Sequence, residues 1–207
     1  MIAAMIPRVA AGHTLPLLLP EIESAETGAG ERPDQARLSQ ELCRSYGQWS
    51  PVVLANLNSM PLDYVARQKV QGNHLTWYLV EQLPFVSRQA LAQRFGTAPA
   101  ETLIRDHVLR LTYTAHDMAG FAADLGHTGP PFAWDEEERL HLRARLDAMF
   151  FLLYGLDRDA ARYILSTFPI VRAEEEARYQ GRFRSHDLIL GYMAAFAAGD
   201  AVTRVAG

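Results

Sequence analysis

The sequence predicts an α+β fold, in which a small mixed segment of strands and helices is followed by a mainly α-helical C-terminal region. Two observations lead to this prediction. Near the start of the chain, short apolar runs are interrupted by prolines, a pattern typical of strands. From residue 87 onward, apolar residues recur at helical spacing between helix start and stop signals. We therefore expect two regions, residues 1–86 and residues 87–207.

The composition is that of an ordinary globular protein. Of its 207 residues, 49% are hydrophobic and 21% are charged, so the chain can form a hydrophobic core. The net charge of -4 does not indicate a nucleic-acid partner, but it allows a local basic strip. The lone cysteine, Cys43, excludes an internal disulfide and a cysteine-based zinc site, and it fits a cytoplasmic location. The apolar start contains Arg8 and three prolines, so neither a signal peptide nor a transmembrane helix is expected.

The beginning of the first region is expected to form two buried strands and a loop. The strands correspond to MIAAMIPRVA, residues 1–10, and TLPLLLPEI, residues 14–22. Each run is too short for a stable helix. Residues 22–37 are mostly small, polar or charged and show no apolar periodicity, which predicts an exposed, mobile loop.

The remainder of the first region is expected to be mixed. A helix should begin near Pro51, because proline is favoured in the first turn of a helix. Pro61 should kink or divide this helix, since proline lacks the backbone N–H that a helix interior requires. Beyond Gly72, the apolar and aromatic run that ends at Pro84 predicts a short strand followed by one helical turn.

The second region is expected to consist of helices. Proline or acidic residues mark their N-terminal ends, and glycine or proline marks their C-terminal ends. The expected helices run from Pro99 to Gly126, from Asp135 to Gly155, from Asp157 to Phe168 before Pro169, and from Ser185 to Gly199. One apolar face of the first of them comprises Leu103, Ile104, Val108, Leu111, Ala115, Met118 and Ala122.

The sequence does not predict a catalytic site. It contains no glycine-rich loop of the kind that holds nucleotide phosphates or a methyl donor. No two histidines have the i, i+4 spacing of a helical zinc site, and His116-Asp117 is the nearest approach to a ligand cluster. The acidic run at residues 135–138 suits the first turn of a helix better than a metal site. Lys69, the only lysine, is not set among the carboxylates of a nuclease site. We expect no catalytic residue, metal or cofactor in this chain.

The stretch TGPPFAWD, residues 128–135, resembles the catalytic motif of adenine-specific DNA methyltransferases, in which Asn or Asp precedes Pro-Pro and an aromatic residue. In that motif the first side chain accepts a hydrogen bond from the amino group of the flipped adenine. Gly129 has no side chain to do so, and the stretch lies between two expected helices. We therefore interpret it as a rigid connector in which Phe132 and Trp134 pack as a hydrophobic staple.

The best candidate for a functional site is YVARQKVQGNHLTWY, residues 64–78. Its two basic side chains, Arg67 and Lys69, are expected to be free of acidic neighbours and could contact phosphates. The polar side chains beside them could bond to base edges, and Gly72 permits close approach of the backbone. A loop at the end of a helix has a similar composition, so composition alone leaves both readings open. The candidate DNA-binding residues are Arg67, Gln68, Lys69, Gln71, Asn73 and His74.

This segment also resembles the end of the target-recognition region in bacterial restriction-modification enzymes that fuse an adenine-specific methyltransferase to a TaqI-like specificity domain. The matching residues are Leu57-Asn58-Ser59, Asp63 to Lys69, His74-Leu75 and Gln82-Leu83-Pro84. Asn73 departs from the family pattern, which has threonine there. The resemblance continues through the second region, where such proteins carry a helical C-terminal extension, and it covers essentially the whole chain.

The resemblance implies that the chain is the non-catalytic DNA-recognition portion of a bacterial DNA methyltransferase or type II restriction-modification enzyme that acts in phage defence. A methyltransferase domain that uses S-adenosylmethionine, with or without an endonuclease, would lie before Met1. The implied partners are double-stranded DNA and that upstream domain or subunit, and Arg182 and Arg184 would add phosphate contacts. The alternative is a structural helical module without DNA affinity that binds another protein through FFLLYG, residues 150–155.

Overall fold

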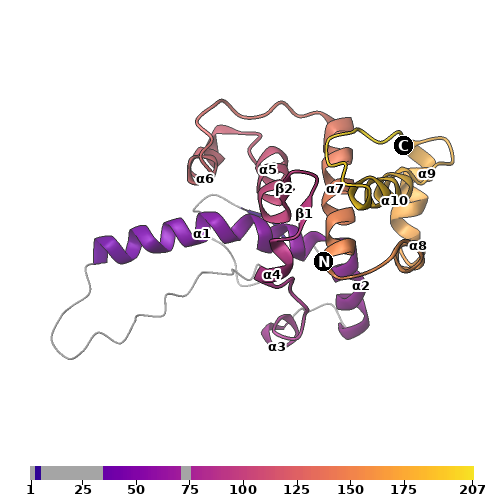
Figure 1. Cartoon of the computed structure of the whole chain (residues 1–207), viewed down its shortest axis with the longest axis horizontal. Coiled ribbons are helices and arrows are strands. Elements are labelled where there is room, and N and C mark those ends of the chain that lie inside the picture. The colour runs from indigo at the N-terminus through magenta and orange to yellow at the C-terminus, as the bar shows by residue number, and fades with distance from the viewer. Residues whose placement is uncertain (1–2, 6–34, 71–75) are drawn as a thin grey trace.

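A computed structural model of the protein describes residues 3–5, 35–70 and 76–207. These residues form a mainly helical structure with one small antiparallel sheet (Figure 1), which confirms the expected α+β class at that coarse level. The elements are α1 (Gln35–Asn58), α2 (Met60–Lys69), α3 (Trp77–Val80), α4 (Arg88–Leu91), β1 (Arg94–Phe95), β2 (Ala98–Pro99), α5 (Ala100–Thr112), η1 (His116–Met118), α6 (Ala119–Asp124), α7 (Glu136–Leu153), α8 (Arg158–Ser166), α9 (Pro169–Arg178) and α10 (Arg184–Ala197).

The two strands predicted near the start of the chain lie outside the described residues, apart from Ala3–Met5, which are not in a strand. Ala3 is held against the end of α1 by Asn58. The Asn58 Oδ1 accepts a hydrogen bond from the Ala3 N–H at 2.9 Å, and the Asn58 amide donates one to the Ala3 carbonyl at 2.9 Å. The predicted loop at residues 22–37 overlaps the described chain only at residues 35–37, and these belong to α1.

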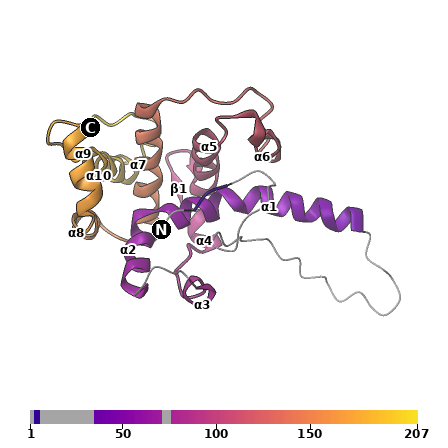
Figure 2. The same ribbon diagram turned by 180° about the vertical axis from the view of Figure 1, so that it is seen from behind.

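α7 is the central helix of the body (Figures 1 and 2) and packs against α10, α5 and α2. Its buried side chains occur all around the helix rather than in one stripe, as expected for a helix surrounded by others. Met149, Phe150 and Phe151, near its C-terminal end, are fully buried. The same core contains Val52 and Ala55 of α1, so it includes residues from both sides of the predicted boundary at residue 86. The division into two regions stays a prediction.

α1 differs from the expected helix because it passes through Pro51 instead of beginning there. A proline within a helix costs one hydrogen bond and crowds the carbonyl four residues earlier, which here belongs to Gly47. Packing offsets this cost: α1 lies along α5, and Pro51, Val52 and Ala55 are buried in the contact. The prediction of a helix start was therefore wrong, since tertiary burial outweighed the local preference of proline.

The prediction that Pro61 divides the helical segment is confirmed. α1 ends at Asn58, Ser59 is the N-cap of the next helix, and Pro61 lies in the first turn of α2. Farther on, a strand was expected before one helical turn. The helical turn is present as α3, but residues 76–86 contain no strand, and residues 71–75 lie outside the described chain.

The small sheet was not predicted from the sequence. β1 and β2 pair antiparallel, with Arg94 opposite Pro99 and Phe95 opposite Ala98. Gly96 begins the intervening turn at a φ of +60°, a conformation that favours glycine. Two residues in each strand are too few to show an alternating pattern, so the hairpin left no periodic signal. It places the Phe95 ring 5.0 Å from that of Phe196 in the core.

The helix expected from Pro99 to Gly126 is interrupted. α5 ends at Thr112, and Tyr113 turns out of the helix because its buried ring packs in a smaller core with Met118 and Ala122. The Tyr113 carbonyl accepts a hydrogen bond from the Phe132 N–H at 2.9 Å instead of one within a helix. Gly126, with a φ of +80°, does end the segment as expected. The predicted single apolar face is therefore divided between two clusters, and its member Ala115 is exposed.

The later helices follow their predicted ends. Asp135 caps α7 by accepting a hydrogen bond from the Glu138 N–H at 2.9 Å, and Gly155 ends it at a φ of +72°. Asp157 caps α8 in the same way, and α10 ends close to Gly199. α9 was not predicted, because Pro169 was read only as the stop of α8. The same proline begins α9, a position that suits its fixed φ.

Candidate functional site

Three of the six predicted DNA-binding residues form the last turn of α2. Arg67 and Gln68 are exposed and Lys69 is partly exposed, while Leu62 and Ala66 on the other side of the helix are buried. The remaining three, Gln71, Asn73 and His74, lie outside the described residues. The structure therefore brings together one half of the predicted set, on the surface and directly before the other half in sequence.

Arg67 is not free of acidic neighbours, contrary to the prediction. Its Nη2 lies 2.8 Å from the Asp63 carboxylate, one helical turn earlier, and its Nε lies 3.1 Å from the same oxygen. The guanidinium group also lies 4.5 Å from the centroid of the Phe168 ring, at the junction of α8 and α9. Arg67 thus fastens α2 to α8, although its side chain keeps 51% of its surface exposed.

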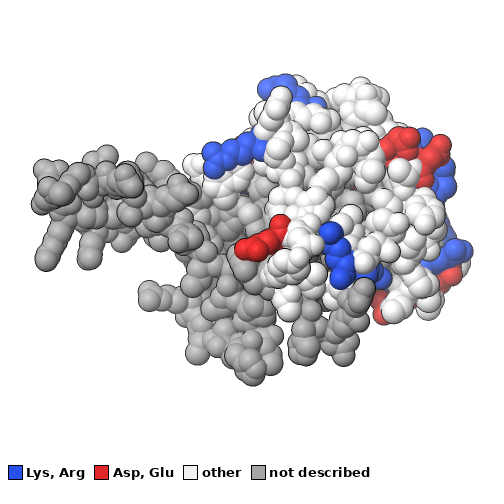
Figure 3. All heavy atoms as spheres, turned by 90° about the horizontal axis from the view of Figure 1, so that it is seen from below, with Lys and Arg blue, Asp and Glu red and all other residues white. Residues whose placement is uncertain are grey.

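Lys69 and Gln68 differ from Arg67 because no side-chain ion pair or hydrogen bond involves them within the described part of the chain. Figure 3 shows the molecule from the side on which α2 and α3 lie. Among the described residues visible on that face, Lys and Arg form separate groups and not one continuous strip. The described basic side chains on that face therefore form no continuous basic surface.

α2 itself is held in place from both ends. The Met60 N–H, in its first turn, donates a hydrogen bond of 2.7 Å to the Asp147 carboxylate of α7. Burial raises the pKa of Asp147 to about 7, and this effect outweighs the hydrogen bond from Met60, which acts in the opposite direction. At the other end, Arg67 contacts Phe168 as described above. The candidate site therefore rests on a helix that two other elements position.

TGPPFAWD is a connector between α6 and α7, as predicted. The Tyr113 hydroxyl donates a hydrogen bond to the Gly129 carbonyl at 3.3 Å, and the Phe132 ring packs against Tyr113 in the smaller core. Trp134 does not join that core, contrary to the expected staple, since 61% of its surface is exposed. Its ring instead lies under the Arg139 guanidinium, at 3.7 Å. The stretch has a structural role with no acceptor side chain at its first position.

The acidic first turn of α7 is largely engaged by arginines. Glu137 accepts hydrogen bonds from both terminal nitrogens of Arg184, at 2.6 and 2.7 Å. The Arg184 guanidinium holds the pKa of Glu137 at about 2, well below its usual range. The Arg184 side chain is only 15% exposed. The expectation that Arg184 contacts DNA phosphates is therefore wrong, because its donors serve an ion pair within the protein.

His141 joins this cluster to α10 in an arrangement that sequence reasoning missed. One ring nitrogen lies 3.3 Å from the Glu137 carboxylate and the other 2.6 Å from the Tyr192 hydroxyl. A carboxylate, an imidazole and a hydroxyl in line can activate a nucleophile. Here His141 is 5% and Tyr192 1% exposed, so the hydroxyl is enclosed and cannot meet a substrate. Burial lowers the pKa of His141. We assign this network to the packing of α7 on α10.

FFLLYG is not an exposed apolar strip, contrary to the alternative hypothesis. Phe150 and Phe151 are fully buried in the main core, and Leu152 and Leu153 are partly buried against it. The Tyr154 hydroxyl lies 2.8 Å from the Pro84 carbonyl and 3.1 Å from the Asn56 side chain. Burial raises the pKa of Tyr154 to about 12. This segment therefore belongs mainly to the core and is not an exposed apolar strip.

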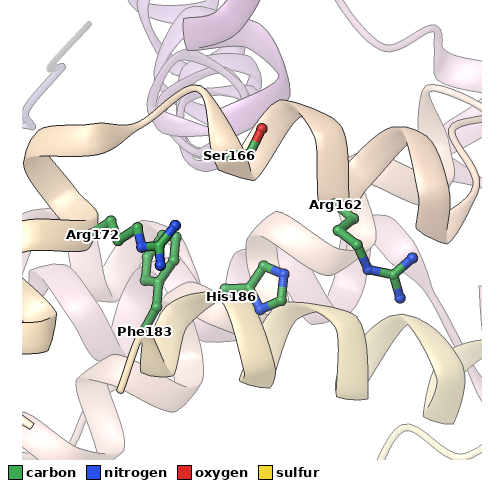
Figure 4. A pocket seen from close by; sticks show the side chains of 5 residues that line it. All are labelled: Arg162, Ser166, Arg172, Phe183 and His186. Carbon is green, nitrogen blue, oxygen red and sulfur yellow. The ribbon is translucent and has the colours of Figure 1, made fainter. Parts of the chain in front are cut away.

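A cavity of about 200 Å³ lies among α8, α9 and α10 (Figure 4). It is lined by Arg162, Ser166, Arg172, Phe183 and His186. The Phe183 and His186 rings are stacked, with centroids 5.7 Å apart and planes at 25°. The residues come from three consecutive helices, and their meeting depends on how these helices pack, so neither spacing nor composition predicted the cavity.

Within the described residues, no group of three or more His, Cys, Asp or Glu side chains could hold a metal ion. Among the helices that the structure describes, none combines the length and the apolar character needed to span a membrane. Comparison of the chain with protein-family models, curated proteins and solved structures finds no match.

Proposed function

We propose that this chain is a non-catalytic DNA-recognition portion of a bacterial DNA methyltransferase or restriction-modification enzyme. The observation that carries the proposal is the segment from Asp63 to Lys69, which resembles the recognition region of such enzymes and places Arg67, Gln68 and Lys69 on one surface turn. Double-stranded DNA is the ligand. A methyltransferase domain or subunit that holds S-adenosylmethionine is the partner, and the location is cytoplasmic.

The geometry of α2 supports this assignment in a specific way. The Asp63 carboxylate and the Phe168 ring hold the Arg67 guanidinium in a defined position, and half of the side-chain surface stays exposed. Lys69, two residues on, adds a second cation. A pre-positioned arginine and a second cation at the end of a helix can contact the phosphate backbone, while Gln68 between them can reach a base edge.

Lys69→Gln is the sharpest variant for a test of this proposal. Removing one phosphate contact should weaken duplex binding about three- to tenfold at low salt and reduce the salt slope by about one. The thermal midpoint should not change, because Lys69 has no side-chain partner in the described chain. Fluorescence anisotropy with a labelled duplex measures the affinity, and thermal unfolding measures the midpoint.

Arg178→Gln is the matched control, because it removes one positive charge from the last residue of α9, at the opposite end of that helix from the Phe168 contact with α2. Equal weakening by Lys69→Gln and Arg178→Gln would mean that only net charge matters and would count against recognition through α2. Arg67→Ala is a poorer test, since it also removes the contacts with Asp63 and Phe168. A loss of DNA affinity in this variant could not be separated from a loss of stability.

A further inference from the structure

Tyr163 of α8 lies directly beside α2, the helix that carries the proposed DNA contacts. The two helices pack side by side (Figures 1 and 2). The Tyr163 ring meets the Tyr64 ring edge to face, with centroids 6.3 Å apart and planes at 77°. Tyr64 lies three residues before Arg67 and is therefore its neighbour on the surface of α2. Tyr163 thus continues the surface around Arg67 onto a second helix.

The position of Tyr163 leaves its side chain available to a ligand. Tyr163 is 63% exposed, while Ile164 and Leu165, the next two residues of α8, are buried in the main core. Tyrosine is among the side chains that donate hydrogen bonds to the phosphates of DNA. An exposed tyrosine beside a cation therefore suits a contact with the DNA backbone.

The hydroxyl of Tyr163 has a proton to donate. A hydrogen bond with Tyr163 raises the pKa of Tyr64. Such a rise is expected when Tyr64 is the donor, because a donated hydrogen bond stabilises the protonated hydroxyl. The Tyr163 oxygen then accepts, and its own O–H stays free for an acceptor outside the protein. Tyr64 therefore orients Tyr163 without occupying its donor.

The acidic side chains one turn before Tyr163 and Arg67 are both paired with arginine. On α8, Asp159 lies 2.6 Å from the Arg162 guanidinium. On α2, Asp63 lies 2.8 Å from the Arg67 guanidinium. Because each acid has a basic partner, neither leaves an uncompensated negative charge that would repel a phosphate.

We propose that Tyr163 is a further DNA-contacting residue, whose hydroxyl donates a hydrogen bond to a phosphate beside the one that Arg67 contacts. The inference rests on the proposed function and deepens it, because it extends the DNA-binding surface from α2 to α8. A neutral hydroxyl releases no counterion, so this contact adds affinity that does not depend on salt. That property distinguishes it from the ionic contacts of Arg67 and Lys69.

Tyr163→Phe tests the hydroxyl alone, since it keeps the ring and its packing against Tyr64. Duplex affinity should fall about three- to tenfold, the effect of losing one hydrogen bond. The salt slope should remain that of the wild type, whereas Lys69→Gln should reduce it by about one. Fluorescence anisotropy of a labelled duplex at several salt concentrations measures both quantities.

Two variants serve as controls. Tyr64→Phe removes the same hydrogen bond between the two tyrosines but leaves the Tyr163 hydroxyl. It should therefore change the thermal midpoint as much as Tyr163→Phe does and leave duplex affinity close to that of the wild type. Tyr179→Phe removes a hydroxyl at the end of α9 that lies opposite the Phe168 contact with α2, and it should not change duplex affinity.

Two results would overturn the assignment of Tyr163. Equal weakening by Tyr163→Phe and Tyr64→Phe would show that the hydrogen bond within the protein matters and not a bond to DNA. Normal binding by Tyr163→Phe with weak binding by Tyr163→Ala would show that the ring, and not the hydroxyl, makes the contact.

The proposed function and the role of Tyr163 can fail separately. A duplex that the wild type binds, and that Lys69→Gln weakens but Tyr163→Phe does not, would contradict only the role of Tyr163. A wild-type chain that binds no duplex at low salt would contradict both.

Discussion

Phe151→Ala is expected to lower the free energy of unfolding by about 3–5 kcal/mol, the usual cost of removing a buried aromatic ring. Phe151 has no exposed surface and lies in the last turn of α7, in the core where helices from both halves of the sequence meet. Deleting its ring leaves a cavity that the surrounding helices cannot close without moving. Urea denaturation followed by circular dichroism measures the loss.

Ile170→Ala is the matched control for this substitution. Ile170 is 70% exposed on α9, so its truncation should change the unfolding free energy by no more than about 0.5 kcal/mol. If Phe151→Ala were as stable as the wild type and altered self-association instead, FFLLYG would be a contact surface and the protein-interaction alternative would regain its support.

Asp147→Asn is expected to stabilise the protein by about 2 kcal/mol at pH 8 and to have little effect at pH 4. Burial raises the pKa of Asp147 from 3.8 to about 7 in the folded chain. Between these values the folded state holds a proton that the unfolded state releases, so stability falls as pH rises through this window. Asparagine carries no charge and can still accept the 2.7 Å hydrogen bond from the Met60 N–H.

The size of this effect follows from the position of the side chain. A fully enclosed carboxylate with such a pKa would destabilise the fold by ~4 kcal/mol above pH 7. Asp147 keeps part of its surface exposed, so water reduces that penalty to about half. The charge of Asp63 acts in the same direction as burial, and that of Arg143 in the opposite one.

Denaturation of the wild type and Asp147→Asn at pH 4, 6 and 8 measures the difference. His141 also titrates with a changed pKa, which is lowered by burial, so its neutral form favours folding and its contribution grows with pH. This contribution is the same in both proteins and cancels in the comparison. Asp117→Asn, at an exposed aspartate, provides a charge-matched control. If the difference in unfolding free energy between the two proteins did not vary with pH, Asp147 would not be the buried carboxylate that holds the start of α2.

The sequence predicted those parts of the fold that local signals determine. Asp135 and Gly155 mark the two ends of α7 because capping and a positive φ depend on a few neighbouring residues. Pro61 divides the N-terminal helices for a similar reason. The interruption at Tyr113 and the continuation through Pro51 depend on which side chains the rest of the chain buries, and no local pattern reports that.

The candidate sites, too, depend on contacts between residues that are far apart in the sequence. The pairing of Arg67 with Asp63 could have been read from their i, i+4 spacing, but the contact with Phe168 joins residues about a hundred positions apart. Arg184 resembled a free cation in sequence, yet its partner Glu137 is 47 residues away. The cavity lined by Arg162, Arg172 and His186 depends on how three helices pack, which no local pattern reports.

Binding of duplex DNA by the full chain at two salt concentrations tests the proposed function most directly. Arg67 and Lys69 at the end of α2 allow about two phosphate contacts, so affinity should fall about tenfold between 50 and 200 mM salt. Anisotropy of a labelled duplex should therefore show saturable binding at the lower salt that is largely lost at the higher. Undetectable binding at tens of micromolar, or binding that does not change with salt, would contradict DNA recognition by this chain.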